Sequence, residues 1–157
     1  MKQSSSFKSS EYWPTWLGIF ALRLLALLPF SMGLKVGRAI GMTLYHLLPK
    51  RRKVVDVNTR LCFPEYTDTE REQFIKEVFR NNGIGVIETA WAYWGNTQKL
   101  SDKTTYIGLE LIEDALKHEK GLILLGAHYS NLDLGACLLA KRDMPLVAMY
   151  REHNNPL

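Results

Sequence analysis

The sequence predicts an α/β fold, in which membrane-associated N-terminal helices precede the start of a mainly parallel sheet flanked by helices. Two observations carry this prediction: a long apolar segment at residues 13–34, and a strand–helix–strand pattern at 121–150. The chain accordingly divides into three parts. These are a loose polar terminus at 1–11, a membrane anchor with a basic amphipathic helix at 12–53, and an α/β domain at 54–157.

Composition narrows the class of protein. The chain has 157 residues, 46% of them hydrophobic, which suffices for one domain with a core. The net charge of +4 fits an anionic partner. No basic stripe interleaved with aromatic residues occurs outside 50–53, so no nucleic-acid partner is expected. The two cysteines lie in apolar text, without a CxxC motif or a Cys/His cluster, so no metal site or disulfide is predicted.

The apolar segment is the candidate anchor. Residues 16–34 contain one charge, Arg23, and one proline, Pro29. A spanning helix needs about 20 apolar residues, and a central arginine costs about 2.5–3.5 kcal/mol of insertion free energy. Tryptophans at its start are typical of a membrane interface. We expect a membrane-embedded or half-inserted anchor; the alternatives are a buried core helix and a cleaved signal peptide.

A second helix is predicted at 36–53. Val36, Ile40, Leu44 and Leu47 share one helical face, and the basic cluster KRRK follows at 50–53. This pattern fits a helix on an anionic membrane surface, and equally a core-packed helix with a solvated basic end. The basic cluster after an anchor places the following residues on the cytoplasmic side.

A long helix is predicted at 68–94. Thr67 and Glu70 form the sequence pattern of a capping box at its start. Its aromatic end, WAYW at 91–94, is interpreted as core, with lipid contact as the alternative.

The rest of the chain predicts alternating strands and helices. Residues 104–108 read as a short strand and 108–120 as a helix, and the apolar runs at 121–127 and 146–150 read as buried strands around a helix at 131–142. Such a unit predicts parallel strands joined by a right-handed crossover.

His128 and Asp133 are the candidate catalytic pair. The spacing alone is weak evidence, because 16 of 157 residues are acidic. Its context is stronger, since His128 follows a predicted strand at the edge where parallel sheets bind ligands. A carboxylate can fix the histidine tautomer, leaving Nε2 to deprotonate a substrate hydroxyl. The alternative is that Asp133 caps the helix and His128 bonds a backbone carbonyl.

A second polar group follows the next predicted strand. Arg151 can bind a phosphate or carbonyl oxygen with two parallel hydrogen bonds. Asn154 and Asn155 belong to a turn whose amides can orient polar groups. We expect these three residues to bind substrate; the alternative is a solvated loop.

An ordered series of segments resembles one family. The series runs nearly end to end and comprises YWPTWLGI, KRRK, LCFPE, GIGVIETAWAYW, GLILLGAHYSNLD and YREHNNPL. It resembles the late lauroyl/myristoyl acyltransferases of lipid A biosynthesis, within the glycerolipid acyltransferase superfamily and its H-x4-D/E motif.

The resemblance implies transfer of a fatty acyl chain from an acyl carrier protein thioester to a hydroxyl of a glycolipid, the lipid A precursor. His128 would be the general base, Asp133 its orienting partner, and Arg151 a donor or phosphate contact. No metal or organic cofactor is implied. The implied location is the cytoplasmic face of the bacterial inner membrane, in contact with membrane lipid.

Two features depart from the family pattern. Many members carry Glu where this chain has Asp133. Members are also longer, so the resemblance covers their N-terminal half and the chain reads as a fragment. The alternatives to an active enzyme are therefore an inactive truncated fragment and a non-catalytic membrane-associated protein. A hydrolase that uses water as the acceptor is a further alternative.

Overall fold

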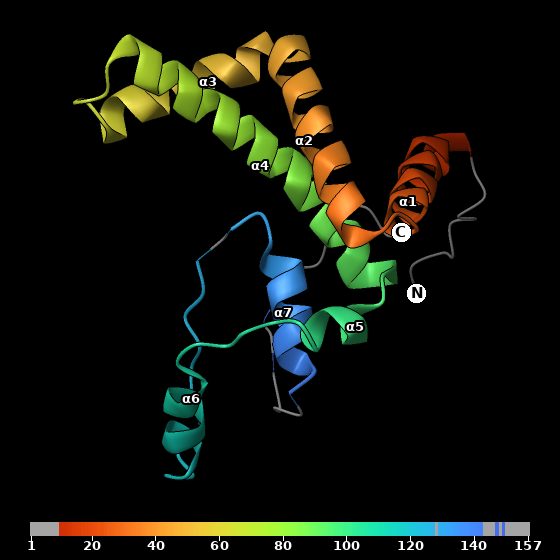
Figure 1. The fold of residues 1–157 in the computed structure, drawn as a ribbon, viewed down its shortest axis with the longest axis vertical. Coiled ribbons are helices and arrows are strands. Elements are labelled where there is room, and N and C mark those ends of the chain that lie inside the picture. Colours follow the sequence, from red (N-terminus) through yellow and green to blue (C-terminus); the bar gives the residue numbers. More distant parts are fainter. Residues whose placement is uncertain (1–9, 128, 143–146, 148, 150–157) are drawn as a thin grey trace, which may run out of the picture.

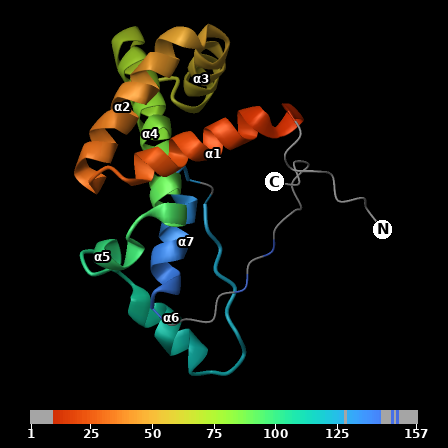
Figure 2. The same cartoon turned by 90° about the vertical axis from the view of Figure 1, so that its right-hand side faces the viewer.

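The computed structural model describes residues 10–127, 129–142, 147 and 149, and every regular element in these residues is a helix (Figure 1). The helix α4 is the spine on which α1, α2, α3 and α7 pack (Figure 2). In chain order the elements are η1 (Ser10–Tyr12), α1 (Trp13–Ala26), α2 (Phe30–Leu47), α3 (Pro49–Cys62), α4 (Asp68–Trp94), α5 (Thr97–Ser101), α6 (Leu109–Leu116) and α7 (Leu132–Ala140).

The prediction of an α/β fold with a parallel sheet is wrong, because the described residues form no strand. Residues 121–127 carry no regular structure, and Ile123 and Leu125 are 93% and 99% exposed. Residues 104–108 are irregular as well and end at Gly108, which has a positive φ of 82°. Of the last predicted strand the structure describes only Val147 and Met149, which are both exposed.

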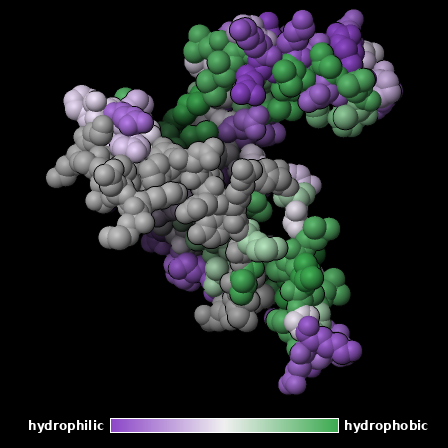
Figure 3. Space-filling model, turned by 180° about the vertical axis from the view of Figure 1, so that it is seen from behind, coloured by the Kyte–Doolittle hydropathy of each residue, from purple (hydrophilic) through white to green (hydrophobic). Residues whose placement is uncertain are grey.

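The physical reason is that an apolar run becomes a strand only when its backbone N–H and C=O groups pair with a neighbouring strand. No such partner lies beside residues 121–127 in the described structure. Their apolar side chains are exposed next to α6. The space-filling view from behind shows a hydrophobic area there (Figure 3).

The apolar segment at 13–34, which was the predicted membrane anchor, does not form one continuous helix. Pro29 divides the apolar segment, so that α1 ends at Ala26 and α2 begins at Phe30. With 14 residues, α1 is about 21 Å long, against about 30 Å for the hydrocarbon core of a bilayer. Among the described residues no helix is both long enough and apolar enough to cross a membrane.

Glycines bring α2 and α4 into backbone contact. Gly33, Gly37 and Gly41 are buried at four-residue intervals on α2, and they face Gly83 and Ile87 of α4. A Cβ atom added to Gly83 would lie 2.1 Å from the Gly37 carbonyl oxygen. The line of glycines, rather than an apolar stripe, is therefore the most buried face of α2.

The predicted helix at 36–53 is two helices. The apolar stripe belongs to α2, which ends at Leu47, whereas the basic cluster begins α3 after Leu48. Next to the glycines, Tyr45 packs edge-on against Phe79 with their ring centroids 5.6 Å apart, and Ile75 joins them in the core.

The predicted helix at 68–94 is confirmed as α4, and so is its capping box. The Thr67 hydroxyl accepts a hydrogen bond from the Glu70 amide at 3.3 Å, and the Glu70 carboxylate accepts one from the Thr67 amide at 2.9 Å. Hydrogen bonds from the Thr67 side chain and backbone lower the pKa of Glu70. The cap therefore favours an ionised Glu70.

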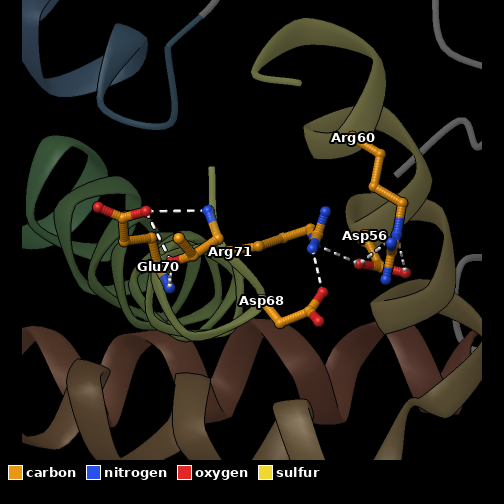
Figure 4. A network of polar contacts seen from close by, with 6 residues as sticks. Asp56, Arg60, Asp68, Glu70 and Arg71 are labelled. Atoms are coloured by element: carbon orange, nitrogen blue, oxygen red, sulfur yellow. Dashed lines mark hydrogen bonds and ion pairs between the residues drawn. The ribbon is translucent and has the colours of Figure 1, made fainter. Parts of the chain in front are cut away.

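An arginine ties α3 to the start of α4 (Figure 4). The buried Arg71 pairs with Asp68 on its own helix, and its Nε lies 3.6 Å from Oδ1 of Asp56 on α3. Asp56 also pairs with Arg60, one turn further along α3, at 3.2 Å. The network holds α3 against α4 at the end of the spine opposite to α7 (Figure 1).

The aromatic end of α4 divides between the core and the surface. Trp91 is half-buried and packs on Phe30 of α2, with ring centroids 5.1 Å apart and planes at 70°. Tyr93 is exposed. The interpretation of residues 91–94 as core therefore holds for Trp91 and not for Tyr93.

Candidate functional site

The candidate site begins at the turn that leads into α7. The Leu132 amide donates to the Tyr129 carbonyl at 3.2 Å, and the Gly135 amide donates to the Asn131 carbonyl at 2.9 Å. Asn131 is thus the N-cap residue of α7, and Asp133 lies in the first helical turn. At this position the helix dipole favours a carboxylate. The alternative role of Asp133 as the helix cap is wrong, because Asn131 is the N-cap residue.

The middle of α4 packs against this turn. The Thr89 hydroxyl donates a hydrogen bond to Oδ2 of Asp133 at 3.4 Å. Gly85 lies so close to Ser130 that an added Cβ atom would be 2.8 Å from the Ser130 Cβ. One turn further on, the Cys137 thiol of α7 lies 3.7 Å from the Ala92 carbonyl oxygen. The segment 129–133 therefore rests directly on one face of α4.

A polar pocket of about 300 Å³ opens at this junction. Asn82 lines it from α4, and Tyr129, Ser130, Leu132 and Asp133 line it from the turn. Asp133 is exposed in the pocket. A group bound here would meet a carboxylate, an amide and hydroxyl groups, which suits a hydrogen-bonding ligand.

Of the predicted site residues, the structure places Asp133. His128, Arg151, Asn154 and Asn155 lie outside the described residues, so their roles stay predictions. Ser130 packs against Gly85 and lines the same pocket as Asp133. Within the described part of the chain no three His, Cys, Asp or Glu side chains cluster as a metal site would require.

Two residues of the pocket region were not predicted from the sequence. Asn82 and Thr89 are seven residues apart, with Gly85 between them, so the three lie on one face of a helix that the sequence did predict. Polar and glycine residues in line within a largely apolar stretch were the available signal. A third polar residue nearby on α4, Glu88, is half-buried, and burial raises its pKa.

Comparison with known proteins assigns the chain to a family. The family described as bacterial lipid A biosynthesis acyltransferase matches residues 1–157. The chain is 33% identical over 156 residues to the lipid A biosynthesis lauroyltransferase of Escherichia coli (strain K12), covering 99% of this chain and 51% of that protein. It is 35% identical over 159 residues to a lipid A biosynthesis acyltransferase of Haemophilus influenzae, covering 98% and 48%.

A lipid A biosynthesis palmitoleoyltransferase of Escherichia coli (strain K12) is 32% identical over 156 residues, with 99% and 51% covered. The chain thus spans about half the length of the curated relatives that it matches. No solved structure matches it significantly. The resemblance seen in the sequence is confirmed: the chain belongs to the bacterial lipid A biosynthesis acyltransferase family.

Proposed function

We propose that the protein is an O-acyltransferase that moves a fatty acyl chain from an acyl carrier protein thioester to a hydroxyl group of a lipid A precursor. The observation that carries the proposal is the family match over residues 1–157, which includes the His128–Asp133 spacing. The relatives' names specify lauroyl and palmitoleoyl transfer.

In the proposed mechanism Nε2 of His128 takes the proton of the acceptor hydroxyl as its oxygen attacks the thioester carbonyl. Asp133 holds the imidazole in the required tautomer. The C–O bond forms and the C–S bond breaks, and the thiol of the carrier leaves with the proton. A thiol has a pKa near 8.5, so its departure needs no strong acid. Arg151 and backbone amides would stabilise the oxyanion.

Substrate contacts are proposed for the second polar group. Arg151 would bind a phosphate or carbonyl oxygen, and Asn154 and Asn155 would orient polar groups of the substrate. The structure supports only the Asp133 side of this site, since Asp133 lies in the first turn of α7 and lines a pocket with polar walls. The reaction as written needs no metal or organic cofactor.

The proposed location is the cytoplasmic face of the bacterial inner membrane, where the glycolipid acceptor would be met at the surface. Two features support it. The first helix exposes large apolar side chains, among them Trp13 (68%) and Leu17 (69%). The cluster at 50–53, at the start of α3, offers cations to anionic headgroups.

The test is a transfer assay with purified protein, a radiolabelled acyl carrier protein thioester and a lipid A precursor. Label should move to the glycolipid. Free fatty acid as the main product, with acceptor present, would replace the proposal by a hydrolase. Binding to anionic vesicles without any transfer would favour the non-catalytic membrane-associated alternative.

A further inference from the structure

The face of α4 beneath the turn at 129–133 carries polar groups that dock the turn and also reach its pocket. Asn82, Gly85 and Thr89 occupy positions i, i+3 and i+7, which lie in one line on a helix. Asn82 lines the pocket, Gly85 contacts Ser130, and Thr89 bonds to Asp133. Three independent contacts thus join the same helical face to the same short turn.

The contact at Gly85 fixes how close the turn lies to α4. An added Cβ atom would be 2.8 Å from the Ser130 Cβ and 3.0 Å from its carbonyl oxygen. Any larger residue would therefore push Ser130 away from the helix. This closeness is what brings Thr89, one turn along α4, within hydrogen-bonding distance of the Asp133 carboxylate.

Thr89 is suited to hold a carboxylate. Its β-branched side chain restricts the hydroxyl to a small set of rotamers on a helix. Among the described residues it is the side chain that donates a hydrogen bond to Asp133. One oxygen of the carboxylate is thereby fixed, and the other is left for a second donor.

Asn82 has no such structural task in the described chain. It is exposed, its side chain makes no hydrogen bond there, and it lines the pocket that Asp133 lines from the other element. A primary amide both donates and accepts, so it can bind a hydroxyl, a carbonyl or a phosphate oxygen of a ligand. Its neighbour Asn81 is exposed as well and is not among the residues that line the pocket.

We propose that this face of α4 is the second wall of the active site, in which Asn82 binds a polar group of the glycolipid acceptor and Thr89 positions the Asp133 carboxylate. The inference rests on the proposed acyl transfer and deepens it. Asn82 contacts substrate directly, whereas Thr89 is a positioning residue that acts through Asp133.

The Asn81–Asn82 pair gives a matched test of acceptor binding. We expect Asn82→Ala to raise the KM for the lipid A precursor about tenfold with little change in kcat, because a lost hydrogen bond to substrate weakens binding. Asn81→Ala should leave both constants unchanged. Binding of the same precursor to the protein in detergent micelles, measured without the acyl donor, should weaken by a similar factor in Asn82→Ala alone.

For Thr89 the isosteric Thr89→Val removes the hydroxyl, and Thr89→Ser restores it. We expect Thr89→Val to lower kcat about fivefold at unchanged KM, since the orienting carboxylate is less well fixed, and Thr89→Ser to recover most of the rate. Thr43→Val on α2 is the control, because the Thr43 hydroxyl bonds only within its own helix in the described structure, to the Ala39 carbonyl at 3.0 Å.

The outcomes separate the two proposals. Equal KM and equal precursor binding in Asn81→Ala and Asn82→Ala would overturn the assignment of Asn82. A Thr89→Val rate equal to that of Thr43→Val, or a loss that Thr89→Ser does not reverse, would reduce Thr89 to a docking contact. If the wild-type protein transfers no acyl chain, the proposed function fails, and the binding comparison still decides whether Asn82 contacts the glycolipid.

Discussion

The contact between α2 and α4 makes a strong prediction about stability. A Cβ atom on Gly41 would lie 2.1 Å from the Phe79 carbonyl oxygen, about 0.9 Å closer than the 3.0 Å that Cβ atoms in proteins respect. The obstacle is backbone, which cannot rotate away as a side chain would. Gly41→Ala must therefore force the two helices apart along their shared face.

Two free-energy terms set the size of the effect. Overpacking a well-packed interface costs about 1–3 kcal/mol, and the rigid obstacle places this site at the upper end. Replacing a helical glycine by alanine returns about 1 kcal/mol through helix propensity. We expect a net loss of about 2 kcal/mol in the free energy of unfolding, or a fall of about 4–8 °C in Tm for a chain of this size.

Gly18 of α1 provides the matched control, since an added Cβ atom there meets nothing within 4 Å. Gly18→Ala should gain about 0.5–1 kcal/mol from propensity alone. Urea unfolding followed by far-ultraviolet circular dichroism measures both variants. Equal stability of the two alanine variants would refute the close packing of α2 on α4, and so would a Gly41→Ala variant as stable as the wild type.

Three further predictions concern single side chains. Thr67→Ala should cost about 1 kcal/mol of stability by removing the cap of α4. Because the pKa of Glu70 is lowered from 4.5, the extra stability of the wild type over Thr67→Ala should be present above pH 4.5 and fade as the pH falls; a cost independent of pH would contradict the role of Glu70. Glu88→Gln tests the raised pKa of Glu88: the folded state prefers the protonated acid, so wild-type stability relative to Glu88→Gln should fall as the pH rises above about 4.5, and a flat difference between pH 4 and 7 would count against it. Arg71→Met should cost about 1–2 kcal/mol of stability because Arg71 is buried. Its partner Asp68 is 91% exposed, so Asp68→Asn should change stability by less than about 0.5 kcal/mol; similar losses of stability in the two variants, measured by thermal unfolding, would contradict this difference.

The helix α4 could be predicted from the sequence because its signals are local. Thr67 and Glu70 are three residues apart, and the residues that form the helix lie between them and Trp94. Pro29 was equally visible, and its missing N–H and fixed φ are sufficient reasons for α1 and α2 to be separate helices. The predicted anchor at 13–34 is accordingly interrupted at that proline.

The prediction of a sheet failed because a strand depends on a partner elsewhere in the chain. The apolar run at 121–127 indicated burial on both faces, but its composition contains no information about which strand would pair with it. The glycines at 33, 37 and 41 present the opposite case. Their four-residue spacing is typical of closely packed helices, so the sequence carries a local signal for the contact with α4.

At the candidate site, the family motif led to Asp133 but not to its neighbours. Thr89 lies 44 residues before Asp133 in the sequence, and nothing local links the two. The contact exists because Gly85 has no side chain, so that Ser130 can pack directly on the backbone of α4. Such a contact follows from tertiary packing, which explains why Asn82 and Thr89 emerged only from the structure.

The most direct measurement is the rate of acyl transfer by the wild type and by His128→Ala, with an acyl carrier protein thioester as donor and a lipid A precursor as acceptor. Removal of a general base should lower the rate by about 10²–10⁴-fold, with the circular dichroism spectrum and the unfolding midpoint unchanged. Equal rates in the two proteins would contradict the His128–Asp133 mechanism.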